Sequence, residues 1–253
     1  MPFLSVPHGQ IYYEDTGKGY PVLLFAPGFL SSRIERWQTN PSNPGKPQAW
    51  RDPVPVLEAD FRVIALDVRN AGQSRVEIQP GDSWHSYTDD HLRLLDHLGV
   101  EHCHVMGACI GVSFALSVAE ARPGCVTSLV LQNPIGLHEN RTTVEGEYDD
   151  WAEKVRHWPN IRPELLPDLK TRMFGNDFLF SVTRDYLASC ELPVLLMPGD
   201  DTMHPAAISA DMARLARNTE VLAPWKGPDH RDAAIRRVHE FFIGHTPASF
   251  LNR

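Results

Sequence analysis

The chain has 253 residues, of which 42% are hydrophobic and 22% are charged, a balance that fits one large globular domain and excludes a disordered chain. Its formal net charge of −8 argues against nucleic acids and anionic membrane surfaces as partners. No apolar run approaches the roughly 20 residues that span a bilayer, and the first residues show no signal peptide, so we expect a cytoplasmic protein.

Strand and helix patterns alternate along most of the chain. Short apolar runs bounded by turn residues are typical of strands, and fully apolar runs indicate burial on both faces of a sheet. The predicted strands occupy residues 4–6, 11–14, 21–26, 61–67, 101–106, 126–131, 192–197 and 219–222, the first two forming a hairpin with His8-Gly9 at its turn. Amphipathic patterns predict helices over residues 88–98, 112–121, 205–216 and 232–243. This order predicts an α/β fold with a mostly parallel sheet and helices on both faces.

Two stretches interrupt the alternation. Residues 31–60 are rich in proline and predict a long loop that ends in a short helix near residues 53–59, with tryptophans packed beneath it. Residues 135–190 hold about three helical patterns between two strands. Because an insertion at this edge of the sheet would cover a site there, we expect a small helical cap after the sixth strand. Residues 1–134 and 191–253 then form the core domain.

The segment at residues 107–111 carries the strongest functional signal. Its sequence, Gly-Ala-Cys-Ile-Gly, matches the G-x-nucleophile-x-G pattern of a sharp turn between a strand and a helix. The positive end of the following helix favours the thiolate form of Cys109. A free cysteine is more often a small core residue, but this placement predicts a nucleophile that forms a covalent intermediate.

A thiol nucleophile needs a base and an acid that orients the base. In the chain order nucleophile–acid–base, the acid follows a late strand and the base follows the last strand. Asp201, in the turn after the strand over residues 192–197, is the predicted acid, with Asp200 as the alternative. His230, between the last strand and the final helix, is the predicted base. Both residue types also have ordinary roles, since aspartates are common in turns and a histidine before a helix often lies on the surface.

Two backbone N–H groups are predicted to hold the oxyanion that forms when a thiolate attacks a carbonyl. One belongs to Ile110, directly after the nucleophile, and the other to Phe29 in the segment Pro27-Gly28-Phe29. The alternative for this second segment is an ordinary proline–glycine turn. The histidines show no ligand spacing on one helix face, and the cysteines contain no C-x-x-C pair, so we predict neither a metal nor a cofactor.

Together these segments resemble the α/β-hydrolase fold superfamily. Four signatures follow one another over nearly the whole chain: residues 27–29, the sequence Asp-Val-Arg-Asn-Ala-Gly-Gln-Ser at 67–74, residues 107–111, and the late Asp201 and His230. The resemblance implies that the 67–74 turn is structural and packs behind the loop that follows residue 29. Within this superfamily the chain resembles a capped, esterase-like member with a cysteine nucleophile. The resemblance does not define the substrate, because proteins of this fold act on many different substrates.

Three departures from the pattern of this superfamily affect the interpretation. Pro27 replaces a histidine that relatives often carry, Asn70 replaces a glycine, and Cys109 replaces the usual serine. Cysteine nucleophiles on this fold resemble those of dienelactone hydrolases, which open lactones, and of polyester synthases, which transfer acyl groups. The absence of an aspartate nucleophile argues against dehalogenase activity.

The predicted function is hydrolysis of an ester, lactone or thioester bond of a small molecule through a Cys109–His230–Asp201 triad and an acyl-cysteine intermediate. An acyltransferase with the same triad is the alternative, because a thioester can pass its acyl group to an amine, thiol or alcohol. A non-catalytic binding protein is a third interpretation, against which the intact residue order argues. The predicted partner is a small-molecule substrate, and the sequence leaves open whether the chain forms a homo-oligomer.

Overall fold

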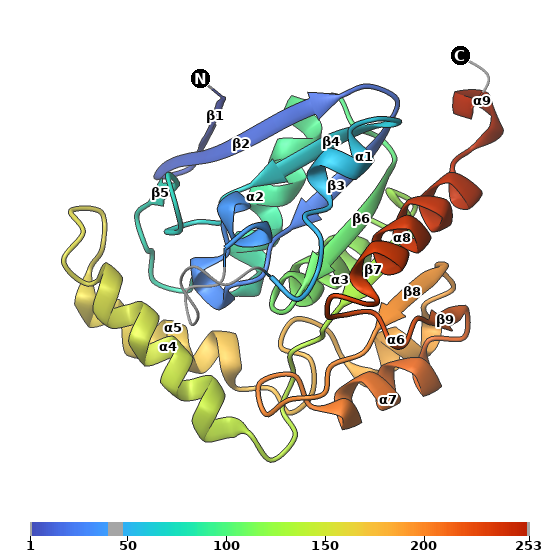
Figure 1. Ribbon diagram of the computed structural model, residues 1–253. Helices are drawn as coiled ribbons and strands as arrows, with labels where there is room; N and C mark the ends of the chain where they lie inside the picture. Colours follow the sequence, from blue (N-terminus) through green and yellow to red (C-terminus); the bar gives the residue numbers. More distant parts are fainter. Residues whose placement is uncertain (1, 40–47, 252–253) are drawn as a thin grey trace.

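The computed structural model of the protein describes residues 2–39 and 48–251. Within these residues the strands run over Phe3–Val6 (β1), Gly9–Gly17 (β2), Tyr20–Phe25 (β3), Phe61–Leu66 (β4), Arg75–Val76 (β5), Cys103–Ala108 (β6), Val126–Gln132 (β7), Val194–Met197 (β8) and Thr219–Val221 (β9). They form one sheet in the order β1-β2-β4-β3-β6-β7-β8-β9, with β5 paired to β2 (Figure 1). β2 is antiparallel to its neighbours, and every pairing from β4 to β9 is parallel. The expected mostly parallel sheet is confirmed.

The helices cover both faces of this sheet (Figure 1). They run over Val54–Leu57 (α1), Trp84–His97 (α2), Gly111–Ala121 (α3), Arg141–Val155 (α4), Leu166–Phe174 (α5), Arg184–Ser189 (α6), Ala206–Leu215 (α7), Arg231–His245 (α8) and Ala248–Leu251 (α9), with 3-10 turns at Phe29–Ser31 (η1), Ile34–Trp37 (η2) and Pro163–Leu165 (η3). None of the helices in the described ranges combines the length and the apolar character needed to cross a lipid bilayer.

Side chains alternate along each strand, which explains why helices pack on both faces of the sheet. In β3, Leu23 and Phe25 belong to the core cluster that includes side chains of α2 and α3. Val22 and Leu24, on the other face, belong to the cluster that includes side chains of α1 and α8. Because successive side chains of a strand point to opposite faces, burial on both sides requires the continuous apolar run from which this strand was predicted.

Every predicted strand and helix is present in the described residues, with some ends shifted. The hairpin turn falls on Pro7-His8 instead of His8-Gly9, because Gly9 already pairs with Val6 in the ladder. The helix predicted from residue 88 begins at Trp84. β5 and α9 were not predicted, since elements this short show no periodic pattern. Of the predicted 31–60 loop, residues 40–47 lie outside the described residues, and its short final helix is α1.

Between β7 and β8 the chain forms α4, η3, α5 and α6, so all three predicted helical patterns in residues 135–190 are present. The last of them is limited to α6. Figure 1 shows α4 and α5 side by side, away from the sheet. This segment is held to the rest of the chain by specific hydrogen bonds, such as the one of 2.7 Å from the Trp84 indole N–H to the carbonyl of Met173.

The 67–74 turn supports the loop that follows β3. The Asp67 carboxylate accepts hydrogen bonds from the backbone N–H groups of Ile34, at 2.9 Å, and Gln73, at 2.8 Å. Gly72 leaves room for this carboxylate, since a Cβ at that position would lie 2.0 Å from the Asp67 Oδ2 atom. The turn therefore ties the loop beyond residue 29 to the end of β4, in agreement with the structural role that the resemblance implies.

Asn70 fills a position in this turn that favours glycine. Its φ of 59° lies in the left-handed region, which asparagine tolerates better than most residues. Its Oδ1 atom accepts hydrogen bonds from the N–H of Val76, at 3.1 Å, and from the side-chain amide of Asn160, at 2.8 Å. The replacement of glycine therefore adds a contact between the turn and the 135–190 segment.

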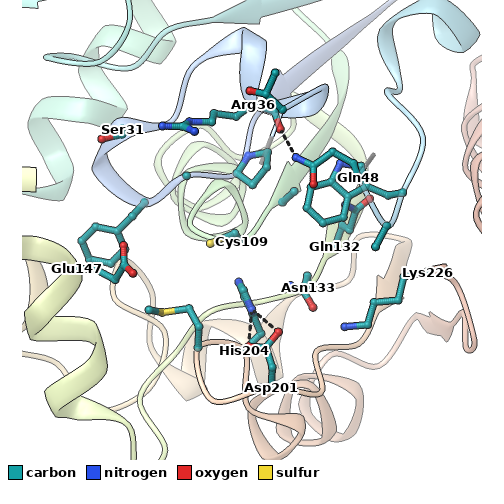
Figure 2. A pocket seen from close by; sticks show the side chains of 18 of the residues that line it. Ser31, Arg36, Gln48, Cys109, Gln132, Asn133, Glu147, Asp201, His204 and Lys226 are labelled. Carbon is teal, nitrogen blue, oxygen red and sulfur yellow. Dashed lines mark hydrogen bonds and ion pairs between the residues drawn. The ribbon is translucent and has the colours of Figure 1, made fainter. Parts of the chain in front are cut away.

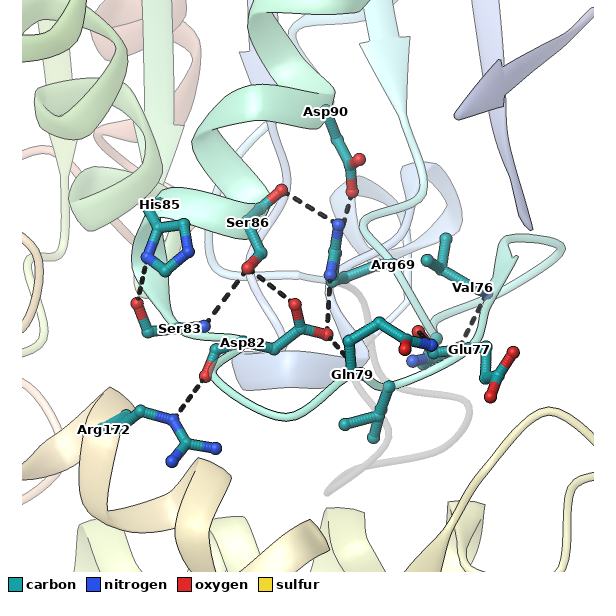
Figure 3. Close-up of polar contacts among 12 residues, drawn as sticks. Arg69, Val76, Glu77, Gln79, Asp82, Ser83, His85, Ser86, Asp90 and Arg172 are labelled. Carbon is teal, nitrogen blue, oxygen red and sulfur yellow. Dashed lines mark hydrogen bonds and ion pairs between the residues drawn. The ribbon is translucent and has the colours of Figure 1, made fainter. Parts of the chain in front are cut away.

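Arg69 forms a buried polar network beneath α2 (Figure 3). Its guanidinium donates to Asp90 at 2.8 Å, to Asp82 at 3.1 Å and to the carbonyl of Ser86 at 3.0 Å. Arg172 of α5 in turn donates to the carbonyl of Asp82 at 2.9 Å. A buried cation with all of these acceptors is well compensated, and the network joins the turn, α2 and the 135–190 segment.

Candidate active site

Cys109 lies in a sharp turn between β6 and α3. Its φ of 56° is in the left-handed region, which is costly for a residue with a side chain. Two glycines make the turn possible: a Cβ at Gly107 would lie 2.1 Å from the carbonyl oxygen of Gly111, and a Cβ at Gly111 would lie 2.3 Å from that of Phe25. The strand–turn–helix geometry expected for a nucleophile elbow is therefore present.

A cavity of about 610 Å³ opens above Cys109, at the edge where β3, β6 and β7 end (Figure 2). Its walls come from the loop after β3, the ends of β6 and β7, helix α4 and the loop after β8. The lining side chains include both signs of charge: Arg36, Lys154, Lys226, His204, Glu147, Asp150 and Asp201. Trp50, expected to pack beneath its loop, also lines the cavity. The cavity is large enough for a small organic substrate.

His204 and Asp201 approach Cys109 from the loop after β8. Nδ1 of His204 lies 2.8 Å and 3.1 Å from the two carboxylate oxygens of Asp201, and the backbone N–H of His204 donates to the same carboxylate at 2.9 Å. The turn is tight, since a Cβ at Gly199 would lie 2.3 Å from the carbonyl oxygen of His204. Figure 2 shows the imidazole directed toward the thiol. Its Nε2 atom is buried, and the imidazole interacts with the Cys109 thiol.

The charges at the three side chains are coupled. Burial opposes ionisation of the Cys109 thiol, but the positive His204 and the backbone N–H groups of Gly28 and Ile110 outweigh it and lower the pKa of Cys109. Burial also disfavours the charged imidazole, yet the thiolate of Cys109 and the carboxylate of Asp201 raise the pKa of His204 to about 10. The hydrogen bond with His204 lowers the pKa of Asp201 to about 2. At neutral pH the site therefore favours a thiolate–imidazolium pair beside a carboxylate.

The structure does not bring His230 to this site. The residue is exposed at the N-terminal end of α8, where its carbonyl accepts the N–H of Ala234, and it does not line the cavity. The imidazole that faces the thiol is that of His204, in the loop after β8, and not that of His230, in the loop after β9 from which the base was predicted. Asp200, the alternative acid, forms an ion pair with Lys226, whereas Asp201 contacts the imidazole.

Of the two predicted backbone donors, Ile110 directly follows Cys109 at the start of α3, and Phe29 lies in the turn after β3, on the wall of the same cavity. The N–H of Ile110 is directed at the sulfur, and so is that of Gly28. Phe29 is the first residue of η1, a position whose N–H has no acceptor within the turn. Gly28 has a φ of 121°, which favours glycine and lets the chain pass close to the thiol.

Sequence reasoning missed several cavity residues. His204 lies only three positions after Asp201, and the pattern Asp-x-x-His in one turn is a signal that could have identified it. Gln132 and Asn133 gave no such signal. The Nε2 atom of Gln132 and the Oδ1 atom of Asn133 are buried without a hydrogen-bond partner in the described part of the chain, and Asn133 has a φ of 51°. Such unpaired groups beside a nucleophile are available to the polar atoms of a substrate.

The described residues contain no group of three or more histidine, cysteine, aspartate or glutamate side chains arranged to hold a metal ion. Around Cys109 the structure places the His204 imidazole, the Asp201 carboxylate and the backbone N–H groups of Gly28 and Ile110.

Comparison with known proteins agrees with this architecture. The model of the alpha/beta hydrolase fold family matches residues 21–221. A protein of Azorhizobium caulinodans, provisionally named carbamate hydrolase RutD, is 32% identical over 84% of this chain and 85% of its own length. The dihydrolipoyllysine-residue acetyltransferase component of the acetoin cleaving system of Pseudomonas putida is 27% identical over 90% of this chain, which spans only 56% of that longer protein.

Solved structures share the fold at lower identity. The meta-cleavage product hydrolase of Pseudomonas fluorescens IP01 superposes with a TM-score of 0.67 over 94% of this chain and 96% of its own, at 19% identity. Because the family model matches most of the chain, the chain belongs to the alpha/beta hydrolase fold family.

Proposed function

We propose that the protein hydrolyses an ester, lactone or thioester bond of a small molecule through an acyl-cysteine intermediate. Cys109 is the nucleophile, His204 the acid–base residue and Asp201 the residue that orients the imidazole. The single observation that carries this proposal is the position of a half-buried imidazole between the thiol and a carboxylate, above a strained turn. The relative provisionally named carbamate hydrolase supports hydrolysis as the class of reaction.

In the first half of the reaction, the Cys109 thiolate attacks the carbonyl carbon and a carbon–sulfur bond forms. The negative charge moves to the carbonyl oxygen, where the N–H groups of Phe29 and Ile110 stabilise it. When the bond to the leaving group breaks, the His204 imidazolium gives its Nε2 proton to the departing oxygen or sulfur. Gly28 keeps its role beside the thiolate, since its N–H is directed at the sulfur.

In the second half, the neutral His204 takes a proton from a water molecule. The hydroxide attacks the thioester carbon, the carbon–sulfur bond breaks and the carboxylic acid leaves. The thiolate and the imidazolium are thereby restored. Asp201 holds Nδ1 in its protonated form throughout, so that Nε2 is the atom that exchanges protons.

The experiment that tests the proposal is intact-protein mass spectrometry after brief mixing with a panel of small esters, lactones and thioesters, followed by peptide mapping. We expect an acyl adduct on Cys109 that decays as the free acid appears, and no adduct with Cys109→Ala. Wild-type turnover in Cys109→Ala would overturn the proposal, because a covalent thiol intermediate could not then carry the reaction.

Acyl transfer is the second candidate, and the named acetyltransferase component among the relatives favours it. The same acyl-cysteine would then pass its acyl group to an alcohol, thiol or amine instead of water. Added acceptors decide between the two reactions. A ratio of acylated acceptor to free acid that rises at millimolar acceptor supports transfer, and formation of the free acid alone supports hydrolysis.

The domain organisation that we propose follows the same division as the sequence analysis, with residues 1–134 and 191–253 as the core and residues 135–190 as a cap. Its support is that α4 contributes Glu147, Asp150 and Lys154 to the wall of the cavity. In this arrangement the cap helps to select the substrate, as expected for a capped esterase-like member.

A further inference from the structure

One arginine on the wall of the cavity has no use in the mechanism above. Arg36 belongs to η2, in the loop that carries the oxyanion donors, and it lines the cavity together with Cys109 (Figure 2). Its side chain packs on Gly28: a Cβ at Gly28 would lie 3.2 Å from Cγ of Arg36 and 3.4 Å from its Nε atom. The N–H of Gly28 interacts with the Cys109 thiol, so Arg36 contacts a residue that itself lies next to the thiol.

The guanidinium of Arg36 has no partner among the described residues. It forms no side-chain hydrogen bond and no ion pair there, and its Nε atom is buried. The carbonyl of Arg36 accepts a hydrogen bond from the Gln48 amide at 3.2 Å, which holds the backbone but leaves the five N–H donors of the side chain free. Arg36 is half-buried, and a cation that loses part of its hydration without gaining a partner is unfavourable, so an anion in the cavity would compensate it.

The neighbouring charges do not neutralise Arg36. Glu35 is engaged by Arg33 at 3.0 Å. On the other walls, Lys226 is paired with Asp200, and α4 contributes two acids and Lys154. The acids of α4 repel an anion from their side, which leaves the wall formed by η2 as the place where an anion is attracted.

We propose that Arg36 binds a carboxylate carried by the substrate, so that the substrates are small carboxylic esters or thioesters with an additional anionic group. The planar fork of an arginine matches the two oxygens of a carboxylate. Arg36 lies beside the loop of the oxyanion donors. In a bound substrate the carboxylate and the carbonyl that Cys109 attacks would therefore be joined by a short chain of atoms. This inference rests on the proposed function for the identity of the reacting atom.

The test compares esters that differ only in charge. Phenyl hydrogen adipate and phenyl hexanoate have the same chain length, and para-hexanoyloxybenzoate carries the carboxylate on the leaving group instead. We expect wild-type protein to prefer one of the two carboxylates over phenyl hexanoate in kcat/KM by roughly 10- to 100-fold, the usual range for a hydrogen bond to a charged group. Arg36→Gln should remove most of this preference, mainly through KM, and Arg36→Lys should retain part of it.

Arg33→Gln is the matched control, because Arg33 lies in the same loop, is paired with Glu35 and does not line the cavity. It should leave the preference as it is in the wild type. A ratio of kcat/KM values is insensitive to a fraction of unfolded protein, so poor folding of a variant cannot imitate the result. No preference in the wild type, or an equal loss in both arginine variants, would overturn the inference.

A second readout separates this inference from the proposed hydrolysis. Iodoacetate and iodoacetamide both alkylate a thiolate, and only the first carries a carboxylate. The rate ratio of the two reagents at Cys109 should fall in Arg36→Gln and stay unchanged in Arg33→Gln. If no ester is cleaved but this ratio falls, the hydrolase proposal fails and the carboxylate site remains. If Cys109 reacts with neither reagent, both fail.

Discussion

The base and the acid of the proposed triad come from a single turn. Asp201 and His204 are three residues apart, and the carboxylate binds both the imidazole and the backbone N–H of His204. The imidazole is thereby oriented by local contacts, and only its approach to Cys109 depends on the packing of the loop against the sheet. This arrangement makes the choice between the two candidate histidines directly testable.

His204→Ala is expected to lower kcat/KM by roughly 10²- to 10⁴-fold, the usual contribution of a positioned acid–base group. His230→Ala should retain near wild-type turnover, because that side chain is exposed and does not line the cavity. Steady-state hydrolysis of phenyl hexanoate by the two variants makes the comparison. A large loss in His230→Ala with normal turnover in His204→Ala would restore the assignment made from chain order.

The reactivity of Cys109 should persist at a pH where an ordinary thiol, with a pKa of about 8.5, is protonated. Burial opposes the thiolate, but His204 and the nearby N–H groups lower the pKa of Cys109, so the thiolate survives as the pH falls. His204→Gln removes the cation and should move the alkylation profile to higher pH. The measurement is the rate of iodoacetamide labelling of Cys109 against pH, and superimposable profiles would contradict the ion pair.

At the scale of elements, the elbow depends on glycines that have no room for a side chain. The carbonyl of Phe25, at the end of β3, lies directly against Gly111, the first residue of α3. Gly146 of α4 is the opposite case, since a Cβ there would meet no atom within 4 Å. Gly111 therefore lies where a helix packs tightly against the sheet, and Gly146 lies on an open helix surface.

Gly111→Ala should therefore destabilise the protein by about 1–3 kcal/mol or more, because the added methyl forces α3 away from β3. Gly146→Ala should instead stabilise it by up to about 1 kcal/mol through the better helix propensity of alanine. Urea unfolding monitored by circular dichroism measures both. Equal effects of the same sign at the two positions would refute the packing argument.

At the scale of the whole molecule, a histidine is buried at the end of the sheet opposite to the cavity. His104 of β6 is fully buried, with its ring stacked on Phe242 of α8 at 4.8 Å and its nitrogens 3.0 Å from Thr246 Oγ1 and 2.8 Å from Ser128 Oγ. Burial, reinforced by the nearby His245, lowers the pKa of His104 to about 3. The residue therefore packs as a neutral ring.

This burial predicts a loss of stability in acid. The pKa of His104 in the folded protein lies below the value of about 6.5 for an unfolded chain, so unfolding takes up a proton and stability falls as the pH drops from 6.5 toward 3. At about pH 5 the effect amounts to roughly 2 kcal/mol. The difference in urea unfolding free energy between pH 7 and pH 5 should shrink by about this amount in His104→Gln. An unchanged difference would contradict the neutral buried ring.

Much of this protein could be predicted from sequence because its signals are local. A strand buried on both faces requires a continuous apolar run, as in β3, and the elbow requires glycines around Cys109. Each feature can therefore be recognised from a few consecutive residues. The 67–74 turn is recognisable for the same reason, since its aspartate, glycine and serine bind one another across a few positions.

Tertiary structure decides which histidine faces the thiol and which arginine lacks an acidic partner. The sequence by itself determined the sheet and the position of the thiol in its strained turn. Whether His204 or His230 faces Cys109 is decided by how two loops from different strands pack, and His230, directly before α8, is exposed to solvent. Likewise Arg36 differs from Arg33 only in its neighbours: one arginine has an acid within reach and the other faces an open cavity. Such differences arise because the partners of a side chain are set by residues far away in the sequence.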